Sequence, residues 1–171
     1  MADNKIITWK QQAIVKAAKY CAYQERTQQE VRDKLYSYGL YTDAVEEVLS
    51  ELISDGFVNE ERFAQAFARG KFRSNKWGRI KIEMGLRQKG ISAYCIRRGL
   101  QEFSEADYID TLTSLIQKKW NSLEGEDTYT RKHKTARFVL GKGYESERIW
   151  KILGDYEDYS TRCSLSRNGT T

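Results

Sequence analysis

The sequence predicts an all-α protein built from three tandem three-helix repeats in an elongated, curved array. The chain of 171 residues contains no proline and has few Val or Thr runs, whereas runs rich in Ala, Leu, Lys, Glu, Gln and Arg favour helices. Apolar residues recur with helical spacing along most of the chain. One pattern also occurs three times, with a period of 51 and then 53 residues.

The repeat is clearest around a glycine that follows a helix. Lys34–Leu52 aligns without gaps on Gly85–Phe103 and on Phe138–Tyr156. Each copy shares one glycine and four apolar positions: Leu35, Leu86 and Val139; Gly39, Gly90 and Gly143; Val45, Ile96 and Ile149; Leu49, Leu100 and Leu153; Leu52, Phe103 and Tyr156. Small units of this kind bury apolar surface by stacking on their neighbours. We therefore expect repeats over 1–55, with an N-terminal arm, over 56–103 and over 104–157, followed by a disordered tail over 158–171.

In the first repeat, three helices are expected after a polar arm. Ala13–Tyr23 carries an apolar stripe, and the capping-box spacing from Thr27 to Glu30 starts a second helix that ends near Tyr38. A third helix covers Thr42–Ser54. Its inward residues are Val45, Val48, Leu49 and Leu52.

The same order of helices is expected twice more. In the second repeat, an N-cap at Asn59 starts a helix whose inner face is formed by Phe63, Ala66, Phe67 and Gly70. A polar link over 74–76 follows. The remaining helices are expected over Gly78–Lys89, Ser92–Glu102, Ser104–Trp120 and Thr128–Gly141, and at the end of the third copy.

The charge of the chain is concentrated in one segment, Arg62–Arg98. This segment holds eleven Lys or Arg residues against one acid, Glu83, so its local charge is about +10 while the whole chain carries +5. Seven acids and no basic residue lie between Leu40 and Glu61, where a solvated helix face is the simplest interpretation. A concentrated cationic segment repels itself unless a counter-charge is present, which indicates a polyanionic partner.

A second basic run lies in the middle helix of the third repeat. If the two basic helices face the same way, they form a track for phosphates. Trp77 is either a partly buried inter-helix residue or a residue that stacks on a base. The candidate residues for binding a filament or DNA are Arg69, Lys71, Arg73, Lys76, Arg79, Lys81, Arg87, Lys89, Arg97, Arg98, Arg131, Lys132, Lys134, Arg137 and Lys142.

Catalytic and metal-binding functions find no motif in the sequence. The single histidine, His133, lies in a basic run and is expected at the surface. Hydrolase, P-loop, zinc-protease and dinucleotide-binding fingerprints do not occur. Cys21 and Cys95 fit core positions, and with Cys163 they form neither a disulfide framework nor a zinc site. We expect a non-enzymatic, cytoplasmic monomer with no cofactor, no metal and no contact with a membrane.

Three stretches together resemble the RecX family. They are AYQERTQQEVRDKLYSYGL (Ala22–Leu40), GFVNEERFAQAFARGK (Gly56–Lys71) and WGRIKIEMGLRQKGI (Trp77–Ile91). They match, in order, the family patterns R-S-x-x-E-L-x-x-K-L-x-x-x-G, D-D-E-R-F-A and L-x-x-K-G-I. Thr27 replaces the usual Ser, Asn59-Glu60 replaces the Asp pair, and Gly85 lies inside a helix. The third repeat is similar mainly through Arg137–Leu153.

The resemblance implies three tandem three-helix repeats that bind the RecA recombinase filament and touch DNA or recombinase subunits. It also implies a non-catalytic inhibitor that limits ATP hydrolysis, strand exchange and the SOS response. The residues alone leave other functions open. These are a general helical DNA-binding protein that does not depend on RecA, a protein-interaction solenoid and, least supported, an enzyme.

Overall fold

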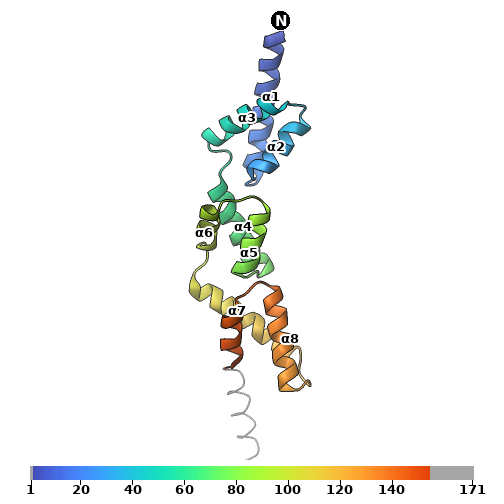
Figure 1. Ribbon diagram of the computed structural model, residues 1–171, viewed down its shortest axis with the longest axis vertical. Helices are drawn as coiled ribbons and strands as arrows, with labels where there is room; N and C mark the ends of the chain where they lie inside the picture. The colour runs from blue at the N-terminus through green and yellow to red at the C-terminus, as the bar shows by residue number, and fades with distance from the viewer. Residues whose placement is uncertain (1, 155–171) are drawn as a thin grey trace, which may run out of the picture. The chain divides into compact units, whose positions relative to one another are not determined.

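The computed structural model describes residues 2–154, with side chains from Trp9 onward. All the secondary structure of this part is helical (Figure 1). The helices are α1 (Ala2–Tyr23), α2 (Gln28–Ser37), α3 (Thr42–Ser54), α4 (Glu60–Asn75), α5 (Arg79–Gln88), α6 (Ala93–Leu100), α7 (Glu105–Asn121) and α8 (Thr128–Gly141), followed by helical residues over 146–154. The prediction of tandem three-helix repeats is confirmed. Tyr156, Cys163 and the tail over 158–171 lie outside the described residues.

Two helices extend further than their sequences indicated. The polar arm expected before Ala13 is helical, because α1 begins at Ala2 and its Lys, Gln and Ala residues favour a helix. Helix α4 continues past Gly70 through most of the expected link and ends at Asn75. A single glycine costs a helix only about 1 kcal/mol, and the buried ring of Phe72 extends the inward face by another turn. Lys76, with φ of 55°, then ends the helix.

The inward face of α4 also differs from the expectation at two residues. Ala66 and Gly70 are exposed, whereas Ala64 and Ala68 are buried beside Phe63. The buried residues follow a stripe with a spacing of four that continues to Phe72, and Ala66 lies on the opposite side of the helix. The apolar character of alanine was therefore a poor guide to its orientation.

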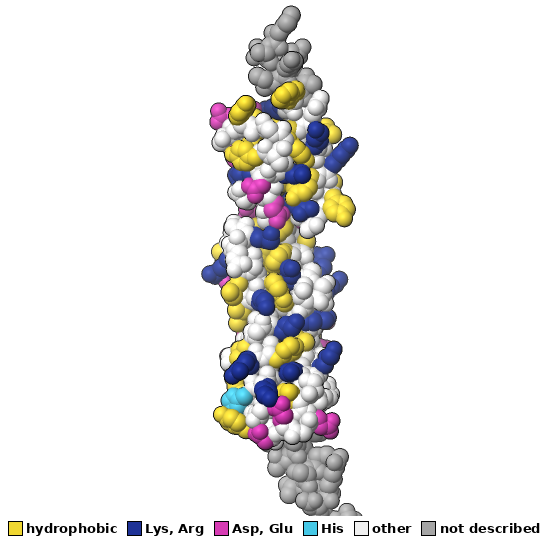
Figure 2. All heavy atoms as spheres, turned by 90° about the vertical axis from the view of Figure 1, so that its right-hand side faces the viewer, with side chains coloured by type: hydrophobic (Ala, Val, Ile, Leu, Met, Phe, Trp, Pro, Cys, Tyr) yellow, Lys and Arg dark blue, Asp and Glu magenta, His cyan; other side chains and the backbone are white. Residues whose placement is uncertain are grey.

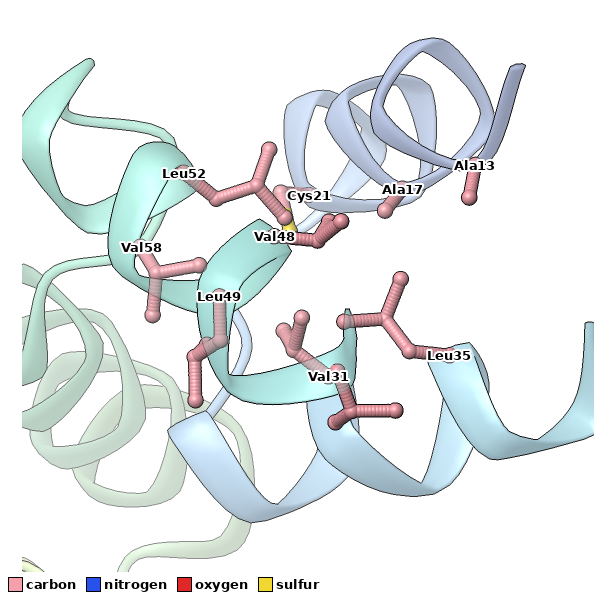
Figure 3. Close-up of a cluster of buried hydrophobic side chains, with 10 residues drawn as sticks. Ala13, Ala17, Cys21, Val31, Leu35, Val48, Leu49, Leu52 and Val58 are labelled. Carbon is pink, nitrogen blue, oxygen red and sulfur yellow. The ribbon is translucent and has the colours of Figure 1, made fainter. Parts of the chain in front are cut away.

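The core of the first repeat is formed by small residues of α1 and larger residues of the two helices that follow. Figure 3 shows Ala13, Ala17 and Cys21 of α1 facing side chains of α2 and α3, including Leu35 and Val48. Cys21 and Cys95 are both buried, as expected. The predicted capping box is confirmed, because the Thr27 hydroxyl accepts from the Glu30 amide and the Glu30 carboxylate accepts from the Thr27 amide.

The described chain divides into two compact units. The first unit comprises the chain up to Arg69 together with Gly85–Glu102. The second comprises Gly70–Met84 together with the chain from Phe103. None of the helices in the described residues is both long enough and apolar enough to cross a membrane.

In the second unit, the end of α8 meets the start of α5 through backbone atoms. The amide of Gly78 donates to the carbonyl of Lys142 at 2.8 Å, and the amide of Ile80 donates to the carbonyl of Gly143 at 3.1 Å. These bonds satisfy amides at the start of α5 that have no partner inside their own helix.

This contact leaves no room for side chains at the two glycines. A Cβ atom on Gly78 would lie 2.3 Å from the carbonyl oxygen of Gly143. A Cβ atom on Gly143 would lie 2.3 Å from the Cβ of Lys81, and Gly143 also has a left-handed backbone with φ of +87°. The glycine expected only as a helix stop is therefore also a packing requirement.

We expect Gly78→Ala and Gly143→Ala each to lower the free energy of unfolding by about 1–3 kcal/mol, because backbone must move to admit a methyl group. Gly70→Ala is the matched control. Gly70 lies within α4, and a Cβ atom there meets nothing within 4 Å. It should therefore raise stability by about 0.5–1 kcal/mol. Urea denaturation measures all three, and equal effects at the three sites would contradict the packing requirement.

Candidate polyanion-binding surface

The fifteen candidate cations do not share one environment, because at least five of them form salt bridges with carboxylates in the described residues. Four of the carboxylates pair with cations of the basic segment Arg62–Arg98 but lie outside that segment themselves. The fifth carboxylate pairs with a lysine of α8. The pairs are Arg69–Glu102 at 2.6 Å, Arg79–Glu105 at 3.0 Å, Lys89–Glu30 at 2.8 Å, Arg98–Glu61 at 2.9 Å and Lys134–Glu126 at 2.7 Å. The local charge counted from the sequence therefore overstates the charge available to a partner.

The repeat explains one of these pairs. Glu61 and Arg98 occupy the same repeat positions as Lys10 and Glu47, which form a salt bridge in the first repeat. The first and third helices of the first two repeats are thus joined at the same place, with the two charges exchanged. The sequence analysis missed this pairing. Adding the period of 51 residues to Lys10 and Glu47 gives Glu61 and Arg98.

Arg79 belongs to a network that holds the second unit together. Its guanidinium lies 4.2 Å from the ring centre of Tyr108 and forms a salt bridge with Glu105. Arg148 also pairs with Glu105. The hydroxyl of Tyr108 accepts from the backbone amide of Arg79 at 3.1 Å and donates to the Glu145 carboxylate at 2.6 Å. The start of α5, the start of α7 and the segment that follows α8 are joined in this way.

The network shifts the pKa of Tyr108 and of Glu105. Burial, followed by the hydrogen bond to Glu145, raises the pKa of Tyr108 far above its usual value, so this hydroxyl stays protonated. Hydrogen bonds from Arg79 and Arg148 lower the pKa of Glu105. Arg79 is therefore a structural residue, and its charge is engaged inside the molecule.

Three more candidate cations donate to backbone carbonyls within the second unit. Lys81 Nζ donates to Gly141 O at 2.9 Å, and Lys142 Nζ donates to Asn75 O at 3.2 Å. Arg131 donates to Trp120 O at 2.9 Å, with its guanidinium 4.5 Å from the Trp120 ring centre. Lys81 thus joins α5 to the end of α8, Lys142 joins that end to the last residue of α4, and Arg131 joins α8 to α7.

Trp77 lies among lysines and is half-buried. The ammonium groups of Lys71 and Lys81 lie 4.9 and 5.0 Å from its ring centre. This environment agrees with the alternative of a partly buried inter-helix tryptophan. The cation–π contacts hold the two ammonium groups near the surface of the unit, and they occupy the face of the Trp77 ring.

Four candidate cations meet two conditions at once: they are exposed, and no hydrogen bond or ion pair within the described residues engages their side chains. We call them the open cations: Arg73, Lys76, Arg97 and Arg137. Arg97 lies in the first unit and the other three lie in the second. The remaining candidates, Lys71, Arg87 and Lys132, have contacts of their own. Figure 2 shows Lys and Arg side chains interleaved with hydrophobic ones on the face that it draws. The open cations are the best placed to meet a polyanion.

The metal-ligating side chains of the described residues are dispersed. In the part of the chain that the structure describes, no group of three or more His, Cys, Asp or Glu side chains is placed to hold a metal ion. His133 is exposed, as expected.

The two kinds of arginine should respond differently to substitution. We expect Arg79→Gln to lower the free energy of unfolding by about 1–2 kcal/mol, because it removes an ion pair and a cation–π contact. Arg73→Gln should change it by less than about 0.5 kcal/mol, as is usual for an exposed side chain. Urea denaturation of both variants makes the comparison, and equal losses would contradict the division into structural and open cations.

Acid should destabilise the fold through carboxylates that are held ionised. Hydrogen bonds from Arg79 and Arg148 lower the pKa of Glu105, and one from Arg32 lowers the pKa of Glu46. These folded-state values lie below the unfolded value of about 4.3. The stabilisation is therefore present above that pH and is lost as the pH falls through the folded pKa.

We therefore expect the free energy of unfolding to be constant between about pH 5.5 and 7 and to fall below about pH 4.5. Glu105→Gln should reduce the acid slope in urea titrations at several pH values. Glu124→Gln should not, because the exposed Glu124 side chain has no ion pair in the described residues. A free energy that stays constant down to about pH 3.5 would contradict this account.

Comparisons with known proteins agree with this architecture. Family models for the first, second and third three-helix domains of RecX match residues 13–52, 59–100 and 105–153. The crystal structure of RecX from Lactobacillus salivarius has a TM-score of 0.80 at 24% identity, covering 92% of this chain and 99% of that one. A second crystal structure, of a regulatory protein RecX, has a TM-score of 0.76 at 22% identity, covering 86% of this chain and 72% of that one. At this identity the structures show the shared fold.

Curated relatives are similar over most of this chain. The regulatory protein RecX of Bacillus mycoides (strain KBAB4) is 30% identical over 148 residues, which cover 86% of this chain and 55% of that protein. The regulatory protein RecX of Bacillus cytotoxicus is equally identical over the same extent. The chain thus spans about half the length of these relatives. Three RecX domain models in their family order, on an all-α fold of three-helix repeats, show that the chain belongs to the RecX family.

Proposed function

We propose that this protein is a non-catalytic regulator of the RecA recombinase. It would bind the RecA–DNA filament and limit ATP hydrolysis, strand exchange and the SOS response. The observation that carries this proposal is the match of three consecutive RecX domains, in order, over residues 13–153. Its relatives are named regulatory proteins.

The open cations supply the attachment in this proposal. Arg73, Lys76, Arg97 and Arg137 are exposed, so they meet phosphates or acidic protein surfaces without first breaking a salt bridge. Each phosphate contact adds affinity that depends on salt and not on base sequence. The paired cations contribute less, because a new contact has to replace an existing one.

Inhibition in this proposal follows from a preference for one state of the filament. A ligand that binds two states equally shifts nothing between them. A regulator that binds the less active state more tightly lowers turnover by changing the populations, and its own residues take no part in chemistry.

Charge reversal at three open cations should relieve the inhibition. The variant carries Arg73→Glu, Arg97→Glu and Arg137→Glu, and leaves Lys76 unchanged because of its positive φ. The control carries Lys19→Glu, Lys118→Glu and Lys151→Glu, three exposed lysines outside the candidate set. RecA ATPase activity on single-stranded DNA is measured with increasing amounts of each protein.

We expect the wild-type protein and the control to slow ATP hydrolysis at similar concentrations. The open-cation variant should need at least about tenfold more protein, since each lost phosphate contact weakens binding. Wild-type protein that leaves ATP hydrolysis unchanged, while binding bare DNA as tightly as a filament, would favour the general DNA-binding alternative. Absence of any salt-sensitive binding to DNA or filaments would favour the protein-interaction solenoid.

A further inference from the structure

Three aromatic rings meet at the surface of the second unit. The ring centres of Tyr129 and His133, one turn apart on α8, are 4.2 Å apart. Trp150, in the helical segment 146–154, meets His133 edge-on with its ring centre at 5.5 Å. Figure 2 draws the single histidine in cyan beside hydrophobic side chains at the surface. We call Tyr129, His133 and Trp150 the aromatic triad.

The exposure of the aromatic triad sets it apart from the other rings of the unit. Tyr129 is 72% exposed and Trp150 is 36% exposed. Phe72, Phe103 and Tyr108 are buried and stack on one another inside the unit. Aromatic side chains gain most when their large apolar surface is covered. The aromatic triad leaves much of that surface open.

The helix that carries Tyr129 and His133 is cationic. Helix α8 contains no acidic residue over Thr128–Gly141, and the ammonium of Lys132 lies 5.9 Å from the Trp150 ring centre. Asp127, just before the helix, is engaged as its N-cap and accepts from the Thr130 amide at 2.9 Å.

One open cation lies in line with the two rings of α8. Tyr129, His133 and Arg137 are spaced by four residues, so they form one stripe along the helix. With a rise of 1.5 Å per residue, Arg137 is about 12 Å from Tyr129 along the helix axis. The stripe thus presents aromatic faces at one end and an exposed positive charge at the other.

Rings flanked by cations match the chemistry of single-stranded nucleic acid. Its bases expose flat faces that stack on aromatic side chains, and its phosphates meet Lys and Arg. A duplex keeps its bases stacked inside, so it offers phosphates but no free base face unless energy is spent to unstack one.

We infer that the aromatic triad is a base-stacking site for an unpaired base of single-stranded nucleic acid, with Arg137 beside it for a flanking phosphate. The inference rests on the proposed function for its biological setting. The open cations account only for contacts with phosphates. The inference adds that the nucleic acid is single-stranded and that one of its bases is bound by stacking.

The test measures binding without RecA, by fluorescence anisotropy. Three labelled probes of equal length are compared: a single-stranded oligothymidylate, its abasic analogue with the same phosphates, and a duplex. The proteins are the wild type, Tyr129→Ala, Tyr129→Phe and Arg137→Gln, with thermal melting as a check on folding. Tyr129 is exposed enough for its truncation to leave the fold intact.

We expect the wild type to bind the oligothymidylate at least about tenfold more tightly than the abasic strand, because base stacking adds to the phosphate contacts. Tyr129→Ala should lose about tenfold on the oligothymidylate alone, and Tyr129→Phe should retain wild-type affinity because it keeps the ring. Arg137→Gln should weaken binding to all three probes by a similar factor.

Two results would overturn the inference. One is equal affinity of the wild type for the base-bearing and abasic strands. The other is a Tyr129→Ala protein that binds oligothymidylate normally but no longer affects RecA, which would assign the aromatic triad to a protein partner. If Tyr129→Ala shows the expected loss while the wild type leaves RecA ATPase unchanged, the base-stacking site stands and the proposed function fails.

Discussion

The end of α8 reaches the start of α5 only because Gly78 and Gly143 carry no side chains. A Cβ atom on Gly78 would lie 2.3 Å from the Gly143 carbonyl oxygen, which accepts from the amide of Ile80 in α5. With the two backbones in contact, Lys81 and Lys142 donate across the same junction. Arg79, two residues after Trp77, stacks on Tyr108. The cohesion of the second unit depends on this junction, and so does the placement of its basic residues.

Charge pairing then determines which basic residues are left for a partner. Acids distributed through the rest of the chain pair with the basic segment, as Glu30 does with Lys89 across 59 residues of sequence. Exposed pairs of this kind add little stability. Their larger effect is to engage cations inside the molecule, so the proposed binding of a polyanion would depend on the few that remain, such as Arg73 and Arg137.

Local features were predictable from the sequence, and long-range contacts were not. The capping box at Thr27, the glycine ends of the helices and the period of the repeat follow from short-range backbone chemistry and apolar spacing. The predicted orientation of Ala66 was wrong because alanine fits either side of a helix. The partner of Arg79 and the second role of Gly143 depend on which helices meet, and spacing along one helix carries no information about that. The exposure of Tyr129 could not be predicted from the sequence for the same reason.

We expect only the four open cations to contact phosphate, and the salt dependence of binding to single-stranded DNA counts these contacts. The logarithm of the affinity falls with the logarithm of the salt concentration by about 0.7 for each phosphate contact on a single strand. Contacts from the four open cations alone predict a slope of about −3, whereas contacts from all fifteen would give about −10. A slope near −10, or one near zero, would contradict the account.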